Sequence, residues 1–140
     1  NEKVAPYMQP LFDNLNVIKH QFASNSSEVK RLEDMQKSDQ LVIEALAFIR
    51  GRSLSETYCI IDEAQNLSPK QMKTLITRAG PGTKIVCMGN IAQIDTPYLT
   101  EGSSGLTYVV DRFRGWEHAG HITLQRGERS RLADYASEVL

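Results

Sequence analysis

The stretch YCIIDEAQN, Tyr58 to Asn66, decides how the rest of this chain is interpreted. Its first residues, Tyr58 to Ile61, are mostly apolar and favour β-structure. They run directly into two adjacent carboxylates, Asp62 and Glu63. The stretch therefore predicts a buried strand that brings two negative charges to one point at its carboxyl end.

Helix-like and strand-like segments alternate after this stretch. Ser68 begins a capping box with Pro69 at the first helical position, and the predicted helix stops at Gly80-Pro81. The apolar run 83–89 predicts a second buried strand. Farther along, the pattern predicts a helix capped by Ser104, a short strand over 121–124 and a helix capped by Ser130. This alternation predicts an α/β fold with a mainly parallel sheet flanked by helices, in which ligands bind outside the carboxyl ends of the strands.

The beginning of the chain is less regular. Apolar residues from Val4 to Ile18 follow helical spacing, and Pro10 is expected to kink or restart that helix. A short charged helix is expected over 28–37. The run LVIEALAFIRG, 41–51, fits either a buried helix or a strand, and we favour a strand over part of it.

The composition is that of a soluble globular domain, with 140 residues, 41% hydrophobic, 24% charged and a net charge of −1. This charge balance gives no whole-domain signature for nucleic acid, although local clusters can bind phosphates. No apolar run approaches the roughly 20 residues of a membrane span, and no signal-peptide pattern is present. Cys59 and Cys87 have no Cys or His at ligand spacing, which favours reduced core residues of a cytoplasmic protein over a metal site.

The carboxylate pair suits magnesium-dependent phosphoryl transfer. Magnesium usually takes one or two carboxylates together with substrate phosphates. Asp62 would hold the ion directly or through water, and Glu63 would orient and deprotonate the water that attacks a γ-phosphate. The alternative is a solvated turn that leads into the Ser68 cap, and the pair alone does not decide between the two.

Two further clusters bear on that choice. The second predicted strand ends at GNIAQID, 89–95, where Gly89 and Asn90 are expected to make a strand-exit turn. In the same stretch, Gln93 is a neutral side chain able to sense a phosphate or a water. The stretch LQRGERSRLA, 124–133, holds three arginines, whose planar guanidinium groups suit phosphate oxygens. Taken alone, each stretch is more typical of a polar loop or a solvated surface. Two neighbouring strands that both end in such groups favour a site.

Together these residues resemble the PhoH-like family, ATPases related to superfamily 1 helicases. The segment 49–86, with its RGR lead-in and DEAQN core, resembles the family's Walker B region, and GNIAQID resembles its third helicase-like motif. SSGL and GERSRLADYA resemble its C-terminal motifs, and EKVAPYMQPLFDNL resembles the helix after its phosphate-binding region. The resemblance covers nearly the whole chain and implies part of a RecA-like P-loop NTPase fold.

The resemblance also implies roles for single residues of the Walker B region. Asp62 matches the magnesium ligand, and Glu63 matches the catalytic base. Gln65 belongs to the same motif and is expected to contact the nucleotide or relay its state. RGR at 50–52 suggests phosphate or RNA contacts, although such a sequence is more often a surface turn.

The other motifs add four candidates. Gln93 is the expected γ-phosphate sensor, and Arg129 is preferred to Arg131 as an arginine finger, with Arg131 also expected near the nucleotide. Asn90 is expected in the cofactor-binding loop, where helicase motifs usually carry aspartate. The amide removes a charge there and weakens any magnesium contact at Asn90, but it leaves the assignment of Gln93 unchanged.

The P-loop pattern G-x-x-x-x-G-K-[S/T] does not occur, because none of the nine glycines is followed by lysine. The strand that carries the P-loop is therefore expected upstream of Asn1. We interpret residues 1–140 as the C-terminal portion of a PhoH-like ATPase domain, inactive alone. The missing part of the sheet would leave an apolar edge or face exposed, through which self-association is expected.

The leading interpretation is a longer protein that binds ATP and hydrolyses it with Mg²⁺. The resemblance implies coupling to RNA unwinding or remodelling, and a ring-shaped homo-oligomer is a further expectation. One alternative is a non-catalytic assembly or partner-binding module on an ATPase-like fold. A metal-dependent nuclease is the third, with Asp62, Glu63 and Asp95 as its acids, but Gln93 and the arginines fit nucleotide chemistry better.

Overall fold

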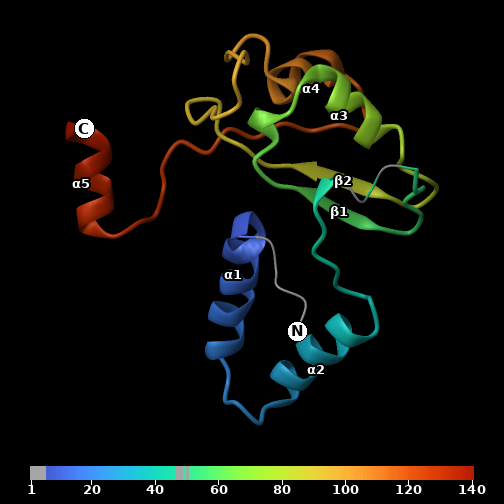
Figure 1. Ribbon diagram of the computed structural model, residues 1–140, viewed down its shortest axis with the longest axis vertical. Helices are drawn as coiled ribbons and strands as arrows, with labels where there is room; N and C mark the ends of the chain where they lie inside the picture. The colour runs from blue at the N-terminus through green and yellow to red at the C-terminus, as the bar shows by residue number, and fades with distance from the viewer. Residues whose placement is uncertain (1–5, 47–48, 50) are drawn as a thin grey trace. The chain divides into compact units, whose positions relative to one another are not determined.

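The computed structural model describes residues 6–46, 49 and 51–140 (Figure 1). The chain divides into two compact units, Asn1–Ser53 and Leu54–Leu140, and each is described by itself.

The first unit consists of short helices. Its elements are η1 (Pro6–Met8), α1 (Gln9–His20) and α2 (Ser27–Lys37). Pro10 lies in the first turn of α1, where its missing N–H costs no helical bond, so the chain restarts at this proline as predicted. Ser26 caps α2 by accepting a hydrogen bond from Val29 N at 3.3 Å, and Val29 is buried. Lys19 Nζ on α1 donates to Gln36 Oε1 on α2 at 3.2 Å.

The strand favoured within 41–51 is not formed in the described residues. Positions 41–45 are neither helix nor strand, and residues 47, 48 and 50, which include the first arginine of RGR, lie outside the described residues. A strand requires a neighbouring strand to pair its backbone groups, and this run has none among the described residues. Arg52 instead forms an ion pair with Glu44 at 3.2 Å.

The second unit is built on two parallel strands, β1 (Tyr58–Ile61) and β2 (Lys84–Cys87), with Tyr58 opposite Lys84 and Ile61 opposite Cys87. The turn η3 (Ala64–Asn66) and helix α3 (Pro69–Ile76) connect them, and α4 (Gly105–Phe113) follows. Figure 1 shows α3 and α4 packed together on one side of the sheet. The parallel α/β arrangement confirms the predicted fold class, part of a P-loop NTPase-like fold.

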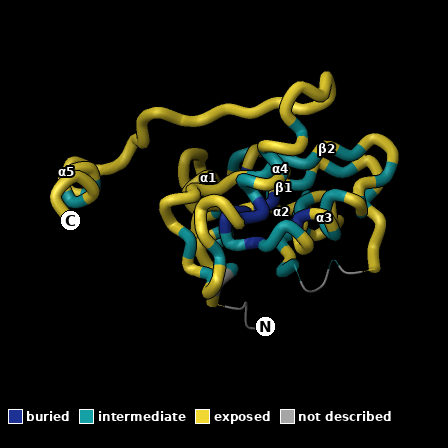
Figure 2. Tube along the Cα trace, turned by 90° about the horizontal axis from the view of Figure 1, so that it is seen from above, coloured by how far each residue is buried: buried dark blue, intermediate teal, exposed yellow. Residues whose placement is uncertain are grey.

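The core lies between η3 and the two helices. Ile61, Ala64, Leu67 and Met72 are its buried apolar side chains (Figure 2). The predicted capping box is present: Gln71 N donates to Ser68 Oγ at 3.1 Å, and Ser68 N donates to Gln71 Oε1 at 2.9 Å. A Cβ at Gly105 would lie 2.6 Å from Leu67 O, so glycine allows the first turn of α4 to approach this backbone.

Helix α3 ends at Ile76, before the predicted stop at Gly80-Pro81. The chain between these points pairs with the residues that precede β1. Leu54 N donates to Arg78 O at 2.9 Å, and Gly80 N donates to Leu54 O at 2.5 Å. A Cβ at Gly80 would lie 2.9 Å from Leu54 O, so Gly80 permits this approach.

The C-terminal part of the chain differs from the prediction in one element. The strand predicted over 121–124 is wrong: these residues have no strand partner in the described chain, and Ile122 and Leu124 are 83% and 85% exposed. Helix α5 (Arg131–Val139) forms as predicted, and Ser130 Oγ caps it by accepting from Ala133 N at 3.2 Å. Figure 2 shows how exposed this part of the chain is.

Apolar side chains are also exposed on β1. Tyr58 and Ile60 are 67% and 56% exposed, whereas Ile61 is buried. The expected apolar face is therefore present in this unit, and self-association through it remains a prediction. In the described part of the chain, no helix combines the length and apolar character needed to cross a membrane.

Candidate functional site

The carboxylate pair begins where β1 ends. Glu63 has a left-handed backbone (φ 53°, ψ 36°), and its N–H bonds to Asp62 Oδ1 at 2.9 Å. A left-handed conformation costs a non-glycine residue roughly 1–2 kcal/mol. Ala64 N, which follows, is fixed by a 2.9 Å bond to Met88 O at the end of β2. The turn thus leaves both carboxylates exposed at the carboxyl end of the sheet.

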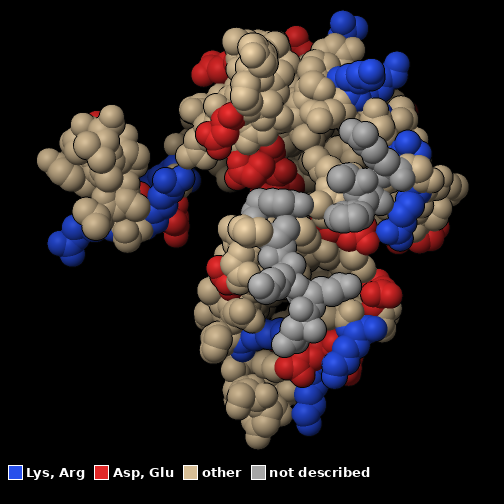
Figure 3. Space-filling model, viewed as in Figure 1, with Lys and Arg blue, Asp and Glu red and all other residues tan. Residues whose placement is uncertain are grey.

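These carboxylates can supply part of a magnesium site. Asp62 Oδ2 accepts no hydrogen bond among the described residues, whereas Oδ1 is occupied by the Glu63 N–H. Hard carboxylate oxygens suit Mg²⁺, whose remaining ligands are usually water and substrate phosphate. Within the described residues no group of three or more His, Cys, Asp or Glu surrounds such a point. Figure 3 shows acidic side chains gathered at this end of the sheet.

Gln65 is the centre of a buried hydrogen-bond network, and its side chain is fully enclosed. Its Nε2 donates to Glu63 Oε2 at 2.5 Å and to Gln93 O at 3.1 Å. Its Oε1 accepts from Asn90 N at 3.2 Å, and Ser104 Oγ donates to its backbone carbonyl at 2.8 Å. The network therefore joins the catalytic candidate Glu63 to the loop that follows β2.

Gly89 makes room for this network. A Cβ at this position would lie 2.5 Å from Gln65 Oε1 and 2.9 Å from Leu106 Cδ2. Real Cβ contacts are not this short, so any larger residue would displace the Gln65 amide or the α4 side chain. The glycine that the sequence placed in a strand-exit turn is needed here for a close approach.

Asn66 holds the far end of the same loop. Its Oδ1 accepts from Asp95 N at 2.8 Å and from Thr96 N at 3.3 Å. Thr96 Oγ1 donates to Asn66 O at 2.9 Å. Sequence reasoning gave Asn66 no role, because its partners lie 29 and 30 residues away and no local pattern identifies them. Asn90 Oδ1 shapes the loop between these anchors by accepting from Ala92 N at 3.0 Å.

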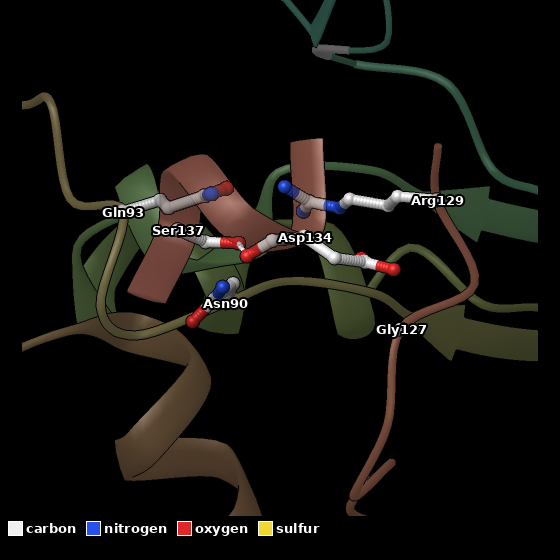
Figure 4. Close-up of a pocket in the computed structure, with 6 residues that line it drawn as sticks. All are labelled: Asn90, Gln93, Gly127, Arg129, Asp134 and Ser137. Carbon is white, nitrogen blue, oxygen red and sulfur yellow. Dashed lines mark hydrogen bonds between the residues drawn. The ribbon is translucent and has the colours of Figure 1, made fainter. Parts of the chain in front are cut away.

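One cavity of about 250 Å³ is lined by the loop after β2 (89–95) and by the arginine-containing segment, which here means residues 124–133 together with the rest of α5. Figure 4 shows Gln93 and Arg129 pointing toward each other across it. The remaining lining residues are Asn90, Gly127, Asp134 and Ser137. The structure thus brings three of the predicted residues together. Asp62, Glu63 and Arg131 do not line this cavity, and Arg131 is the first residue of α5.

The cysteines lie in the strands, as expected, and neither forms a disulfide. Burial raises the pKa of the Cys59 thiol. Burial also raises the pKa of the Cys87 thiol, and the neighbouring Cys59 adds to this shift. Both side chains are therefore held as neutral thiols near pH 7, in keeping with a packing role.

Comparison with known proteins gives one consistent family. A family model described as PhoH-like protein matches residues 1–138. Protein PhoH2 of Bacillus subtilis is 46% identical over 140 residues, which is 99% of this chain and 30% of that protein. The PhoH-like protein of the same organism is 35% identical over 125 residues, 89% of this chain and 36% of that protein. Protein PhoH2 of Mycolicibacterium smegmatis is 33% identical over 141 residues, all of this chain and 30% of that protein. The chain thus spans about a third of the length of these relatives.

Proposed function

Because the chain belongs to the PhoH-like family, we propose that it supplies the magnesium-binding and water-activating half of an ATP-hydrolysing site in a longer protein. The observation that supports this most is the exposed Asp62–Glu63 pair at the carboxyl end of β1, tied by Gln65 to the Gln93 loop. Parallel sheets bind their ligands at this end. The nucleotide's phosphates would be held by a P-loop outside these 140 residues.

In this proposal Asp62 would hold Mg²⁺, directly or through water, because its Oδ2 accepts no hydrogen bond among the described residues. When bound, the ion would supply positive charge beside the nucleotide's phosphates. Glu63 accepts a proton from the water that attacks the γ-phosphate, and its left-handed turn presents the carboxylate at the sheet end. Gln93 contacts the γ-phosphate or that water through its exposed side-chain amide.

The arginine-containing segment would complete the charge stabilisation. Arg129 lines the same cavity as Gln93 and Asn90, so it is the preferred arginine finger. Arg131 lies two positions on, in the first turn of α5, and is the second candidate. Asn90 contributes a neutral contact to the nucleotide. RNA unwinding or remodelling, and assembly of the longer protein into a ring, remain parts of the proposal that the family resemblance motivates.

A second function, assembly without catalysis, is favoured by a different observation. Tyr58 and Ile60 on β1, and Leu132 and Tyr135 on α5, expose apolar surface that a partner could cover. The two functions differ in what they require of Glu63, because an assembly module has no use for a base at the sheet end.

The test is Glu63→Gln in the full-length protein, with Glu33→Gln on the exposed face of α2 as the matched control. ATP turnover is expected to fall by about 100-fold or more, the range for the loss of a catalytic base, while ATP binding measured by calorimetry is retained. The control should keep full turnover. Undiminished turnover in Glu63→Gln would remove the base from this position. No ATP turnover in the unsubstituted full-length protein would instead favour the assembly function.

A further inference from the structure

We propose that Gln65 is a positioning residue: it orients the Glu63 carboxylate and fastens it to the backbone of Gln93, so that base and sensor keep one geometry. The inference rests on the proposed function for the roles of Glu63 and Gln93. It replaces a direct nucleotide contact by Gln65 with an indirect action through its two neighbours.

The hydrogen-bond inventory of Gln65 excludes a direct contact in this geometry. A glutamine amide has two N–H donors. One is used by Glu63 Oε2 and the other by Gln93 O, while Oε1 accepts from Asn90 N. The side chain is fully buried, so no surface of it is left for a phosphate.

The partners also fix which way the amide points. Exchanging its oxygen and nitrogen would set a carbonyl oxygen against the Glu63 carboxylate and the Gln93 carbonyl, both of which only accept. It would also set an NH₂ group against the Asn90 N–H. Only the observed orientation satisfies all three partners, so the amide has a single orientation. That orientation fixes the position of the Glu63 carboxylate relative to the backbone of Gln93.

The chemistry of the position follows from this. Glutamate at position 65 has nearly the same shape but no donor, and it would bring a second carboxylate against Glu63. Methionine fills the volume but leaves Gln93 O and Asn90 N without their partner in a buried place. Both substitutions are therefore expected to release Glu63 from its fixed orientation while the magnesium ligand Asp62 is left unchanged.

Gly89 offers an independent route to the same effect. Its φ is not in the left-handed region, so Gly89→Ala brings no backbone strain. The added methyl would instead press on Gln65 Oε1 and Leu106 Cδ2. If Gln65 acts through position alone, Gly89→Ala should reproduce a milder form of the Gln65 variants.

The first measurement is hydrogen–deuterium exchange of the full-length protein, read in peptides that cover 88–96. Gln65→Glu and Gln65→Met should raise exchange there by about tenfold, because Asn90 N loses its acceptor or that acceptor loses its anchor. The matched control is Gln40→Glu, which makes the same charge change at an exposed position after α2. Unchanged exchange in both Gln65 variants would overturn the proposed tether, whatever the protein hydrolyses.

The second measurement is ATP turnover. Each Gln65 variant is expected to lower kcat by about tenfold or more with KM within about twofold, since the lost orientation acts on the transition state. A raised KM with unchanged kcat would make Gln65 a binding residue and would overturn positioning.

A double-variant cycle separates positioning from general damage. In a background that carries both Glu63→Gln and Gln93→Ala, the further change Gln65→Met should lower the residual rate by less than about twofold, because both side chains that Gln65 positions are already gone. Multiplicative losses would show a merely structural role and overturn the inference. Full turnover in Glu63→Gln alone would instead contradict the proposed function, a result distinguishable from these.

Discussion

The two strand ends and the arginine-containing segment both carry residues of the proposed site, but the chain holds them in different ways. Around η3, side chains bond to backbone 25 to 39 residues away. Between 117 and 140, the described side-chain hydrogen bonds join residues at most four positions apart. Long-range hydrogen bonds thus fix the first region, whereas the second lines a cavity with the loop after β2 but has only local side-chain hydrogen bonds among the described residues.

Because of this difference, we expect substitutions in the two regions to affect stability and ATP turnover differently. A change near η3 alters the geometry of several backbone groups at once, so stability and chemistry should fall together. A change at an exposed arginine removes a charge that the fold does not use. It should therefore affect chemistry without affecting stability.

Arg129→Ala is expected to give the largest effect. If Arg129 stabilises charge on the transferring phosphoryl group, turnover in the full-length protein should fall by about 10³-fold, the lower end for an arginine finger. The fall should be larger than any loss of ATP affinity, because the charge develops in the transition state. The free energy of unfolding should change by less than about 0.5 kcal/mol, as for other exposed positions.

Arg126→Ala is the matched control, since it removes an exposed arginine from the same segment without reaching the cavity. Steady-state kinetics of the unsubstituted protein, Arg129→Ala and Arg126→Ala measure the change in turnover. Urea denaturation of the same three proteins measures the change in the free energy of unfolding. A larger loss in Arg131→Ala would move the finger to that residue. A pure affinity effect would make Arg129 a binding residue.

The same difference explains what the sequence could predict. Strands β1 and β2 and the caps Ser68, Ser104 and Ser130 depend on short-range patterns, and all form where expected. The prediction that both strands are buried is wrong, because Ile61 is the only buried residue of the two strands. The strand predicted over 121–124 has the apolar character but no partner among the described residues, and no local pattern reveals a missing partner.

The candidate site shows the same limit. The DEAQN motif located the carboxylates, because their place after an apolar strand is a local property. It did not reveal that Gln65 is enclosed or that Asn66 anchors a distant loop, because both facts depend on a register between segments 25 or more residues apart. Gly89 was visible as a turn residue, but its close approach to Gln65 was not.

Asn66→Ala is expected to give an intermediate effect and to test the fixed region directly. It removes the acceptor of two backbone N–H groups, at Asp95 and Thr96, of which the second is partly buried. The free energy of unfolding should fall by about 1–3 kcal/mol. Urea denaturation of the chain, followed by the fluorescence of its single tryptophan, measures this.

Asn66→Asp replaces the amide oxygen with a carboxylate oxygen to which both N–H groups can still donate. It should therefore lower the free energy of unfolding much less than Asn66→Ala does. Asn14→Ala, at an exposed position on α1, is the control and should change little. Equal losses in the alanine and aspartate variants would mean that the acceptor is not what holds this loop. The contrast between the two regions would then lose its main support.

Leu132→Gln is expected to give the smallest effect and is the most direct way to break the comparison. Leu132 is 77% exposed on α5, and leucine and glutamine have similar helix propensities, so unfolding free energy should change by less than about 0.5 kcal/mol. Met72→Ala, at a fully buried position on α3, is the contrasting variant and should cost about 2–5 kcal/mol in the same urea experiment.

A loss above about 1 kcal/mol in Leu132→Gln would show that α5 packs against the rest of its unit or another copy in solution. Repeating the titration at several protein concentrations separates these two causes, because only association makes the midpoint depend on concentration. In either case the arginine-containing segment would no longer be held by local hydrogen bonds alone. Arg129→Ala would then be expected to lower the free energy of unfolding as well as ATP turnover.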